Sequence, residues 1–309
     1  MTRCAIAVVG GILMDLSLQV PVFPEPGRAV HGGGFRAACG GKGANQACAA
    51  ARMGARSSLI GCVGADGLGE LALADLSASG VDITSVIRRP DAATGVMITA
   101  TGPDGRSGIM VARGANALLG ADEVTRCGDV LRQADAVVVQ LETTLPAVQA
   151  ALRIARDAGV AIIFNPAPRF AFPREWLGLC DYLVANEEEA GQLAGSSDRS
   201  PTSAVGVARA LKACGPRNVL ITLGSRGVWV DGASWSGQVP AYRVAAIDAL
   251  GAGDTFAGAL AVRLCEGATV HAAAQFASAA AALSTTRYGG LPSIPARGEV
   301  ERMMATTTT

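Results

Sequence analysis

One short stretch of this sequence combines residue types that could move a phosphoryl group. It reads Gly251-Ala252-Gly253-Asp254 and stands directly before an apolar helical pattern. A glycine turn at a helix start aims free backbone N–H groups at one point, where negative charge is stabilised. The Asp254 carboxylate on the same turn is a candidate general base. Together these features predict phosphoryl transfer to an alcohol, whereas a plain glycine turn with an aspartate helix cap is the structural alternative.

A second glycine-rich stretch offers a cation and an amide. It reads Gly40-Gly41-Lys42-Gly43-Ala44-Asn45. Its glycines would let the backbone approach a ligand closely, while Lys42 supplies positive charge and Asn45 both donors and an acceptor. The stretch is neither a P-loop nor a dinucleotide fingerprint, because it lacks the G-K-[ST] ending and does not follow the first strand. An ordinary loop-to-helix junction remains the alternative.

Polar residues also follow several strand-like runs. The segment Thr222–Gly227 predicts either a site for nucleotide phosphates or a hairpin turn. Asn186 and Glu189 open a helix, where acidic residues stabilise the macrodipole, or where Glu189 could reach a hydrated Mg²⁺. Glu142 ends one strand, and we expect Asp15 to end the first strand in the same way. Ligands bind at that edge of open α/β sheets, so both carboxylates could accept hydrogen bonds from sugar hydroxyls or order a loop.

Short runs of Val, Ile and Leu alternate with helical patterns, which predicts a mostly parallel sheet covered on both faces. The expected strands are Ala5–Val9, Ser58–Val63, Val96–Thr101, Ala136–Leu141, Ala161–Asn165, Tyr182–Ala185, Val219–Leu223 and, before the glycine turn, Tyr242–Ile247. The expected helices are Ala44–Met53, Gly69–Ser77, Ala121–Gln133, Leu145–Ala158, Pro201–Ala213, Thr255–Leu264 and Val270–Thr285.

Two regions interrupt this alternation. Leu16–Ala37 is rich in Pro and Gly without a helical pattern, and Thr94–Ala112 reads as strand, turn, strand. We expect both to form extra strands, over about 11–38 and 94–113, that stand off the main sheet as a lid. The chain of 309 residues is then one α/β domain over 1–309.

Composition excludes several classes of function. The formal net charge is zero and no basic run points to nucleic acid or to a membrane surface. The sequence has two histidines, His31 and His271, which lie far apart, so we do not expect a Ser-His-Asp catalytic system. Eight cysteines without a C-x-x-C pair predict free thiols in a reducing compartment, so we expect a cytoplasmic protein.

These stretches together resemble the ribokinase-like (PfkB-type) carbohydrate kinases, and the ribokinases within that family most of all. The resemblance runs from about Ala5 to Pro295, with Gly40–Ala47 matching the N-terminal signature and Asp248–Phe256 the C-terminal one. Further matching segments fall between them in the family's order: Gly114-Ala115-Asn116, Gln140-Leu141-Glu142, Asn165-Pro166-Ala167-Pro168, Asn186–Glu189 and Thr222–Gly227.

The resemblance implies a three-layer α/β/α sandwich with a small β-sheet lid, and transfer of the ATP γ-phosphate to the 5-hydroxyl of D-ribose. Asp254 would be the general base, and the amides of Gly251, Ala252 and Gly253 would form the anion hole. The residues implied to hold the sugar are Leu13, Asp15, Gly40, Gly41, Lys42, Asn45, Glu142 and Asp254. Those implied to contact ATP are Asn186, Thr222, Gly224, Ser225, Gly227, Gly253 and Ser278.

The resemblance also implies metal ions and a partner. Glu189 would support Mg²⁺ through water. Members of the family bind an activating K⁺ beside the anion hole, and many dimerise through the lid. The positions that match the K⁺ site are Asp248, Leu250, Ser284, Arg287, Gly289 and Ser293.

Three residues depart from the family pattern. Leu13 stands where ribokinases commonly carry Asn, and deoxyribokinases carry an apolar residue there. A leucine cannot pair with a buried sugar hydroxyl, so 2-deoxyribose is an alternative substrate. Ala249 replaces a threonine of the C-terminal signature, and Ser278 stands where ribokinases can have histidine beside the adenine.

The sequence leaves alternatives open. Another sugar or nucleoside kinase of the same fold would carry the same signatures. A sugar-binding or regulatory protein without catalysis would need a reason to keep Asp254 and the glycine turn. A dinucleotide-dependent oxidoreductase fits poorly, because the first strand is followed only by Gly10-Gly11.

Overall fold

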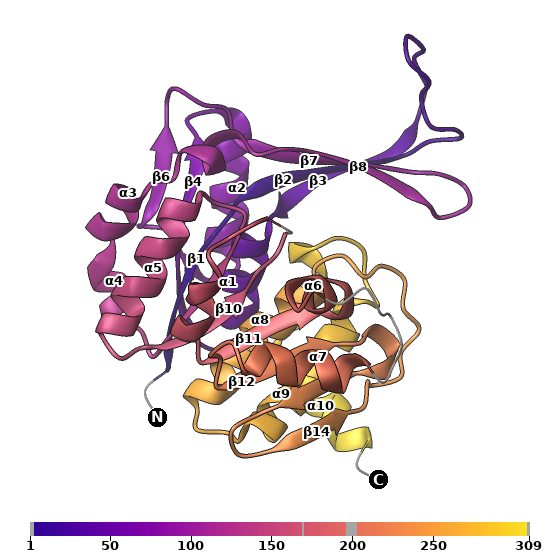
Figure 1. Ribbon diagram of the computed structural model, residues 1–309. Helices are drawn as coiled ribbons and strands as arrows, with labels where there is room; N and C mark the ends of the chain where they lie inside the picture. Colours follow the sequence, from indigo (N-terminus) through magenta and orange to yellow (C-terminus); the bar gives the residue numbers. More distant parts are fainter. Residues whose placement is uncertain (1–2, 169, 196–202, 308–309) are drawn as a thin grey trace.

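The computed structural model describes residues 3–168, 170–195 and 203–307. Figure 1 shows a large sheet between two layers of helices and a small sheet that projects from one side. The strands of the large sheet are β1 (Ala5–Val9), β4 (Arg56–Gly64), β5 (Val81–Asp82), β6 (Val86–Arg89), β9 (Ala136–Gln140), β10 (Ala161–Asn165), β11 (Tyr182–Asn186), β12 (Asn218–Thr222), β13 (Val228–Asp231) and β14 (Ser236–Val239).

The large sheet is mostly parallel. Its order is β14-β13-β12-β11-β10-β9-β1-β4-β5, with β6 also paired to β4. Strand β13 runs antiparallel to both of its neighbours, β12 and β14, and the other described pairings of this sheet are parallel. The central strand β9 reads Ala-Val-Val-Val-Gln and is buried throughout. Continuous apolar runs of this kind are typical of parallel strands covered on both faces. The predicted fold class, a mostly parallel α/β sandwich with a small separate sheet, is therefore confirmed.

Two apolar clusters separate the sheet from its helices. One contains Val8 and Val138 and the other contains Val9 and Val139, because successive side chains of a strand point to opposite faces. The helices over the first cluster are α1 (Lys42–Arg52), α2 (Gly67–Ala78), α8 (Ala252–Cys265), α9 (Val270–Ser284) and α10 (Arg297–Thr307). Those over the second are α3 (Ala121–Arg126), α4 (Gly128–Arg132), α5 (Leu145–Asp157), α6 (Glu187–Leu193) and α7 (Ser203–Lys212).

Four short 3₁₀ helices complete the described chain: η1 (Gly114–Leu118), η2 (Arg174–Leu179), η3 (Gly224–Arg226) and η4 (Leu291–Ser293). Side-chain caps set several helix starts. Thr144 Oγ1 accepts from Ala147 N at the start of α5, and Thr269 Oγ1 accepts from Ala272 N at the start of α9, each at 3.2 Å. No helix in the described parts of the chain is both long and apolar enough to cross a membrane.

The small sheet contains β2 (Leu13–Gln19), β3 (Gly33–Gly40), β7 (Gly95–Thr101) and β8 (Ser107–Ala112) in the order β3-β2-β7-β8. Its inner end packs against α2, where the Cys39 amide donates to Asp75 Oδ2 at 2.9 Å. Its outer end extends away from the body in Figure 1. Strands β2 and β3, with a loop between them, and strands β7 and β8 lie largely within the two regions, about 11–38 and 94–113, for which the sequence predicts extra strands.

Two predicted elements are wrong. Tyr242–Ile247 is not a strand: most of this segment is solvent-facing, Ile247 is 54% exposed, and the Ile247 and Asp248 amides donate to Thr285 O instead of a neighbouring strand. The helix expected over Ala121–Gln133 is broken at Cys127, just before Gly128, a residue of low helix propensity.

Other elements are closely predicted or lie partly outside the described residues. The bounds of β1 and β10 agree with the prediction, and α5 agrees to within one residue. The predicted helix Pro201–Ala213 corresponds to α7 from Ser203 onward, and its first two residues lie outside the described part. The hairpin of β13 and β14 and helix α10 were not expected.

Candidate active site

Helices α1 and α8 cross closely and bring polar residues of the first to the carboxylate of the second. At the crossing, a Cβ on Gly258 would lie 2.6 Å from both Ala49 Cβ and Gln46 O. Only glycine permits this approach, since real Cβ contacts are longer. Gly258 lies one turn after Asp254, so the same crossing places Asp254 beside Asn45 and Gln46 of α1.

The Asp254 carboxylate is held at both oxygens. Asn45 Nδ2 donates to Oδ2 at 3.2 Å, and Gln46 Nε2 donates to Oδ1 at 3.0 Å. Lys42 Nζ lies 3.9 Å from Oδ1. Asp254 is only 6% exposed, so these donors replace the water that would solvate an ionised carboxylate. The geometry suits a general base that is fixed in place.

The glycine turn precedes Asp254 as the sequence predicts. Gly251 is the N-cap of α8 with φ 76°, a left-handed conformation that favours glycine. The Ala252 amide donates to Ala249 O at 3.2 Å, and the Thr255 amide donates to Gly251 O at 2.8 Å. A Cβ on Gly253 would meet nothing within 4 Å, so the helix start is open on that side. The turn can therefore receive an anion on the side of Gly253, as helix N-termini do, and the Ala252 amide would join such a site by exchanging its bond to Ala249 O.

The small sheet supplies the second wall. Leu13 and Asp15 lie on one face of β2, two residues apart, and Leu13 pairs with Gly40 in register. A Cβ on Gly40 would fall 2.0 Å from Asp15 Oδ2, which shows how closely this carboxylate crosses the β3 backbone. Gly41 follows as the N-cap of α1.

The predicted position of Asp15 is wrong in one respect. Asp15 does not end the first strand: β1 ends at Val9, and the chain crosses through Gly10 and Gly11 into the small sheet. The carboxylate reaches the same site from the small sheet, because β2 starts beside the carboxyl end of β1.

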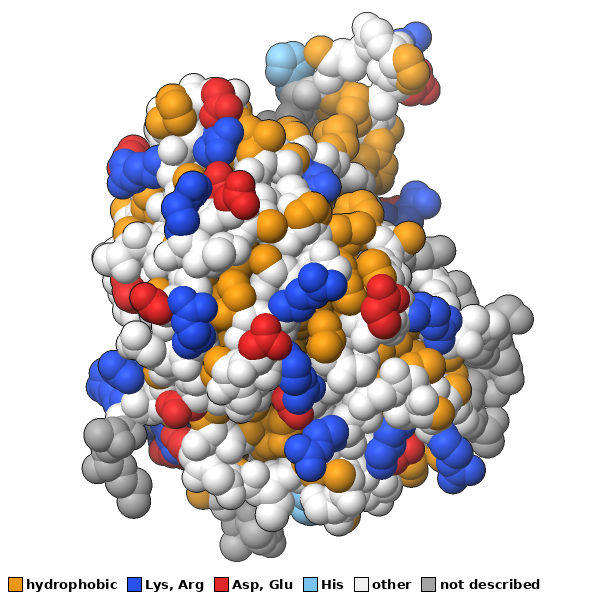
Figure 2. All heavy atoms as spheres, turned by 60° about the vertical axis from the view of Figure 1, so that its left-hand side comes forward, with side chains coloured by type: hydrophobic (Ala, Val, Ile, Leu, Met, Phe, Trp, Pro, Cys, Tyr) orange, Lys and Arg blue, Asp and Glu red, His pale blue; other side chains and the backbone are white. Residues whose placement is uncertain are grey.

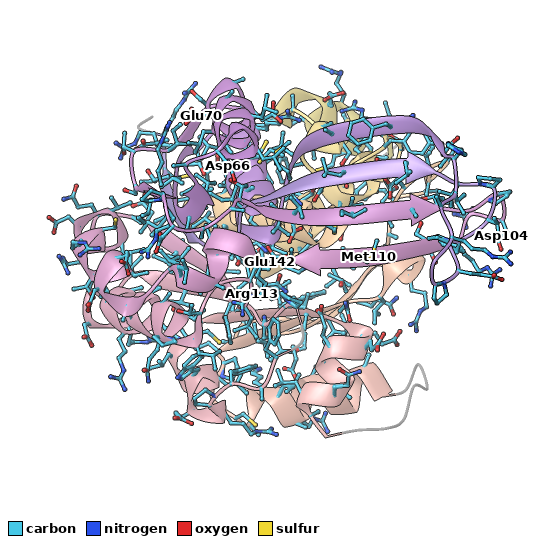
Figure 3. The ribbon with its side chains drawn as sticks, turned by 90° about the horizontal axis from the view of Figure 1, so that it is seen from above. Asp66, Glu70, Asp104, Met110, Arg113 and Glu142 are labelled. Carbon is cyan, nitrogen blue, oxygen red and sulfur yellow. The ribbon has the colours of Figure 1, made fainter. Side chains whose placement is uncertain are left out.

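Glu142 lies two residues after β9, which ends at Gln140 and not at Glu142 as the sequence predicts, and its side chain contacts the start of α1. Its Oε2 accepts from the Lys42 amide at 2.6 Å, at the start of α1. Arg113 Nη2 donates to Thr143 O at 2.7 Å and so ties the next residue to the small-sheet connection. Figure 3 shows Glu142 and Arg113 at the inner end of the small sheet, far from Asp104 at its tip. Glu142 therefore stands where the large and small sheets meet.

Burial and like charges make this cluster a strong electrostatic site. Burial, followed by the charges of Glu142 and Asp254, raises the pKa of Asp15 to about 7. Burial also raises the pKa of Glu142 to about 7, against the opposing effect of Lys42. The Asp254 charge raises the pKa of Lys42 despite burial, so this lysine stays cationic. Perturbed groups of this kind gather at functional sites.

Two buried acceptors on the predicted sugar residues have no hydrogen-bond partner among the described residues. They are Asp15 Oδ1 and Asn45 Oδ1. An unpaired buried acceptor costs about 1–3 kcal/mol, so each calls for a donor from a ligand or from water. A polyhydroxy compound carries such donors, and the carboxylates of Glu142 and Asp254 could accept others.

Strands β11 and β12 bring the predicted nucleotide residues together. Asn186 and Thr222 are register partners at the ends of these strands. Asn186 Oδ1 accepts from the Glu189 amide at 2.8 Å, and Glu189 Oε2 accepts from the Asn186 amide at 2.9 Å, a capping box. The Glu189 charge also acts on Lys42. The helix-start explanation of these residues therefore agrees with the structure.

The segment after β12 is a hairpin turn, as the structural alternative expects. Helix η3 joins β12 to the antiparallel β13, and Gly224 and Ser225 are exposed. Arg226 Nη2 lies 2.6 Å from Glu187 Oε2, which links this turn to the start of α6. Ser278 is buried on α9 at 8% exposure. Contact of these residues with ATP stays a prediction.

The candidate cation residues come from two loops that Asp248 joins. Asp248 Oδ1 accepts from the Leu250 amide at 3.0 Å, and Oδ2 accepts from the Gly289 amide at 2.9 Å. Ser293 is fully buried and its Oγ donates to Gly290 O at 2.7 Å. Ser284 is likewise buried at the end of α9, whereas Arg287 pairs with Glu299. The predicted positions therefore lie on neighbouring loops behind the glycine turn.

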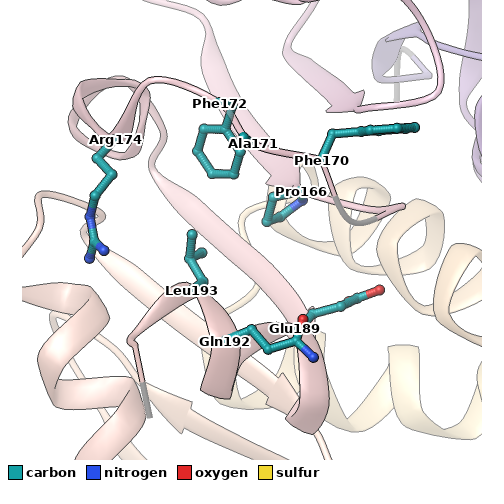
Figure 4. A pocket seen from close by; sticks show the side chains of 8 residues that line it. All are labelled: Pro166, Phe170, Ala171, Phe172, Arg174, Glu189, Gln192 and Leu193. Carbon is teal, nitrogen blue, oxygen red and sulfur yellow. The ribbon is translucent and has the colours of Figure 1, made fainter. Parts of the chain in front are cut away.

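A pocket of about 400 Å³ lies to one side of the cluster. Figure 4 shows Glu189 and Gln192 of α6 on one side of it and Phe170 and Phe172 on the other. Neither Asp15 nor the glycine turn lines it. Of the predicted residues it therefore touches only Glu189.

Sequence reasoning missed two residues of the site. Gln46 bonds Asp254 directly, and Arg113 braces the chain at Glu142. Gln46 follows Asn45 in the second glycine-rich stretch, so its polarity in an alanine-rich helix was the available signal. Arg113 precedes the segment Gly114-Ala115-Asn116 and had no comparable signal.

Comparison with known proteins agrees with this geometry. The family description "pfkB family carbohydrate kinase" matches residues 5–297. The chain is 37% identical over 297 residues to a ribokinase of Haemophilus influenzae. The matched region covers 96% of this chain and 97% of that protein. It is 31% identical over 291 residues to a deoxyribokinase of Salmonella typhi, spanning 94% and 95%.

A solved structure shares the fold across the whole chain. The ribokinase of Arabidopsis thaliana, complexed with ribose and ATP, gives a TM-score of 0.90 at 27% identity and covers 98% of this chain and 99% of that one. This fold and the family match span both glycine-rich stretches and Asp254. The chain belongs to the pfkB family of carbohydrate kinases.

Proposed function

We propose that this protein is an ATP-dependent ribokinase, which transfers the γ-phosphate of ATP to the 5-hydroxyl of D-ribose. The observation that carries the proposal is the buried Asp254 carboxylate, fixed by Asn45 and Gln46 at the open start of α8. Relatives named ribokinase at 37% and 36% identity support ribose as the substrate.

The residues of the cluster have separate roles in this proposal. Asp254 takes the proton from the sugar hydroxyl as the hydroxyl attacks. The amides of Gly251, Ala252 and Gly253 stabilise charge on the migrating phosphoryl group. The sugar is held by Asp15, Gly40, Gly41, Lys42, Asn45 and Glu142. The unpartnered Asp15 Oδ1 and Asn45 Oδ1 fit this, because sugar hydroxyls would supply their missing donors.

The nucleotide belongs beside the ends of β11 and β12. Asn186, Thr222, Gly224, Ser225, Gly227 and Ser278 are the residues that we propose contact ATP. Exposed Gly224 and Ser225 leave backbone and hydroxyl groups accessible to phosphates. Glu189 would hold Mg²⁺ through water, and its carboxylate suits a hard cation that keeps its waters. When bound, Mg²⁺ supplies positive charge to the phosphates.

We also propose a K⁺ site behind the glycine turn. Carboxylate, hydroxyl and main-chain oxygens are a donor set for hard cations, and Asp248 already joins both loops. The proposed oxygens come from Asp248, Leu250, Ser284, Arg287, Gly289 and Ser293. Turnover in K⁺ should exceed turnover in tetramethylammonium; equal rates would remove K⁺ from the proposal.

We propose that the chain forms a single α/β domain. Its small sheet would act as a lid over the site and as the interface through which two copies of the chain dimerise. Met110, Ile98, Leu16 and Ala37 form one apolar row across its four strands, and nearby Phe35 is 69% exposed. Figure 2 shows hydrophobic side chains gathered on this projecting part. Such exposed apolar patches mark interfaces. A single monomer peak in sedimentation velocity would contradict the dimer.

A cytoplasmic location is the last part of the proposal. All eight cysteines are free thiols in the structure, which suits a reducing compartment. The proposed substrate ATP is also an intracellular compound.

One residue favours a second candidate, a 2-deoxyribose kinase. Leu13 is 5% exposed and lies on the same face of β2 as Asp15. An apolar side chain there offers no partner to a sugar hydroxyl but suits a deoxy carbon. A relative named deoxyribokinase at 31% identity supports this candidate.

A kinetic panel tests both candidates. Sugar-dependent ADP release would be measured with ribose, 2-deoxyribose, fructose and nucleosides, and the position of the phosphate in the product would be read by ³¹P NMR. We expect ribose to give the highest kcat/KM and a 5-phosphate. A much higher kcat/KM for 2-deoxyribose would select the second candidate, and turnover of none would refute a kinase.

A further inference from the structure

We infer that Gln46 is a positioning residue for Asp254, and that Asn165 fixes Gln46 in the orientation this role requires. The inference rests on the proposed role of Asp254 as general base. Gln46 is fully buried on α1, and Asn165 is 7% exposed at the end of β10. Neither residue is among those that we propose to contact the sugar or ATP.

A chain of three hydrogen bonds connects the sheet to the base. Asn165 Nδ2 donates to Val184 O at 2.8 Å. Gln46 Nε2 donates to Asn165 Oδ1 at 3.1 Å and also to Asp254 Oδ1 at 3.0 Å. Both hydrogens of the Gln46 amide are thereby used.

The direction of this chain follows from its first member. The Val184 carbonyl can only accept, so Asn165 must present its nitrogen there and its oxygen to Gln46. Gln46 must then present its nitrogen to Asn165, and the same nitrogen faces Asp254 Oδ1. A backbone group of β11 thus determines that Asp254 Oδ1 receives a hydrogen-bond donor from Gln46.

The arrangement leaves one atom unsatisfied. Gln46 Oε1 is buried and has no hydrogen-bond partner in the part of the chain that the structure describes. Turning the amide over would place Oε1 against two acceptors and lose both bonds to Nε2. An unpaired buried acceptor is costly, but turning the amide over cannot remove this cost without losing both bonds. We expect an ordered water to meet this oxygen in part.

Other charged groups face Asp254 and must be kept constant in any test. Lys42 lies 3.9 Å from Asp254 Oδ1 on α1. The charge of Asp254 contributes to raising the pKa of Glu142, which follows β9, and the pKa of Asp15, which lies on β2. Substitution of Gln46 leaves all three in place and removes one neutral donor.

The first test is Gln46→Met, which keeps the length of the side chain and removes the donor. We expect kcat to fall about tenfold through loss of alignment, with KM for the sugar changed less than about threefold. The acid limb of kcat should move to higher pH, because the base has lost a hydrogen-bond donor. A purely structural role would lower the melting temperature without moving this limb.

Two further variants separate the donor from packing. Gln46→Glu puts a second acid beside Asp254, so the acid limb should move further up than in Gln46→Met. Asn165→Leu removes the group that orients Gln46 and should shift the limb in the same direction by a smaller amount. The double variant Gln46→Met/Asn165→Leu should be no worse than Gln46→Met alone, because both act through one contact.

A matched control removes a different buried hydrogen bond to the same helix. Ser57 Oγ donates to Ala47 O at 2.8 Å and has no contact with Asp254. Ser57→Ala should lower stability and leave kcat and its pH profile unchanged. A shifted acid limb in this control would contradict the inference.

The outcomes distinguish the inference from the function on which it rests. An inactive wild-type protein, or an active Asp254→Asn variant, would refute the proposed function. Suppose instead that the wild type is active and Asp254→Asn is inactive. If Gln46→Met then has the kcat and the acid limb of the wild type, only the inference is overturned. Should Gln46→Met fail to fold, an unchanged acid limb in Asn165→Leu overturns it equally.

Discussion

The two halves of the candidate site are built differently. On the sugar side, Asp15, Lys42, Glu142 and Asp254 lie close together in a largely buried cluster that contains unpartnered acceptors. The pKa values of Asp15, Lys42 and Glu142 are raised there. On the nucleotide side, Asn186 and Glu189 satisfy each other in a capping box, and the turn at η3 is exposed.

This difference indicates how each half would recognise its ligand. The sugar side is prepared in advance by side chains that cannot satisfy one another, so its ligand must bring donors of defined geometry. The nucleotide side offers backbone and hydroxyl groups on a turn that is already stable. We therefore expect substitutions on the sugar side to affect catalysis and those on the nucleotide side to affect mainly ATP affinity.

The largest expected effect is at the base. Asp254→Asn keeps the shape of the side chain and removes its basicity, so kcat should fall by about 10²–10⁴-fold. Asn186→Ala, its counterpart on the nucleotide side, should raise KM for ATP more than it lowers kcat. Steady-state kinetics of both variants with both substrates varied would check this. Similar effects of the two substitutions on kcat would contradict the contrast between the halves.

The second-largest effect on activity is expected at the start of α8, where the sugar side and the nucleotide side of the site meet. A methyl group at Gly253 has room in the protein itself, since nothing lies within 4 Å. Gly253→Ala should therefore fold normally but obstruct the approach of the phosphoryl group, with activity lowered about 10–100-fold. Gly67, at the start of α2, has the same free space and no place in the site, so Gly67→Ala is the matched control.

Activity assays and thermal melts of this pair would decide whether the space is functional. Equal activity of Gly253→Ala and Gly67→Ala would show that no phosphoryl group passes there.

Sugar preference gives a smaller effect on the sugar side. Leu13→Asn supplies a donor and an acceptor beside Asp15, so the ratio of kcat/KM for ribose to that for 2-deoxyribose should rise about tenfold. KM for ATP should not change. The ratio would be measured by competing the two sugars in one assay. An unaltered ratio would remove Leu13 from the specificity of the site.

The smallest effect is on stability. A carboxyl whose pKa is raised to about 7 when folded, against about 4 when unfolded, binds more protons in the folded state between these values. Its contribution to stability is therefore full below pH 4 and is lost as pH rises through 7. Asp15→Asn removes this titration, so its melting temperature relative to wild type should increase from pH 5 to pH 8. A constant difference would refute the raised pKa.

Much of the fold could be predicted because parallel strands covered on both faces have a simple pattern. The apolar runs Ala5–Val9 and Ala161–Asn165 predicted β1 and β10 with their observed bounds. The pattern failed at Tyr242–Ile247, where apolar residues lie on an exposed loop. Residue type there did not indicate whether a neighbouring strand existed.

The candidate site was predictable only where residues fall in a marked local pattern. The glycine turn identified Asp254, and the second glycine-rich stretch identified Lys42 and Asn45, which the structure brings together. Gln46 escaped because its role depends on the crossing of α1 and α8 at Gly258 and on the orientation of Asn165. Such long-range geometry has no signal in the spacing of residues along the chain.

A structure of the protein with ribose and a non-hydrolysable ATP analogue would test the central claim most directly. We expect the primary hydroxyl of the sugar within about 2.6–3.2 Å of the Asp254 carboxylate, with other hydroxyls donating to Asp15 Oδ1 and Asn45 Oδ1. The γ-phosphate should lie at the Gly251–Gly253 turn. A sugar bound elsewhere, or one whose primary hydroxyl points away from Asp254, would contradict the account.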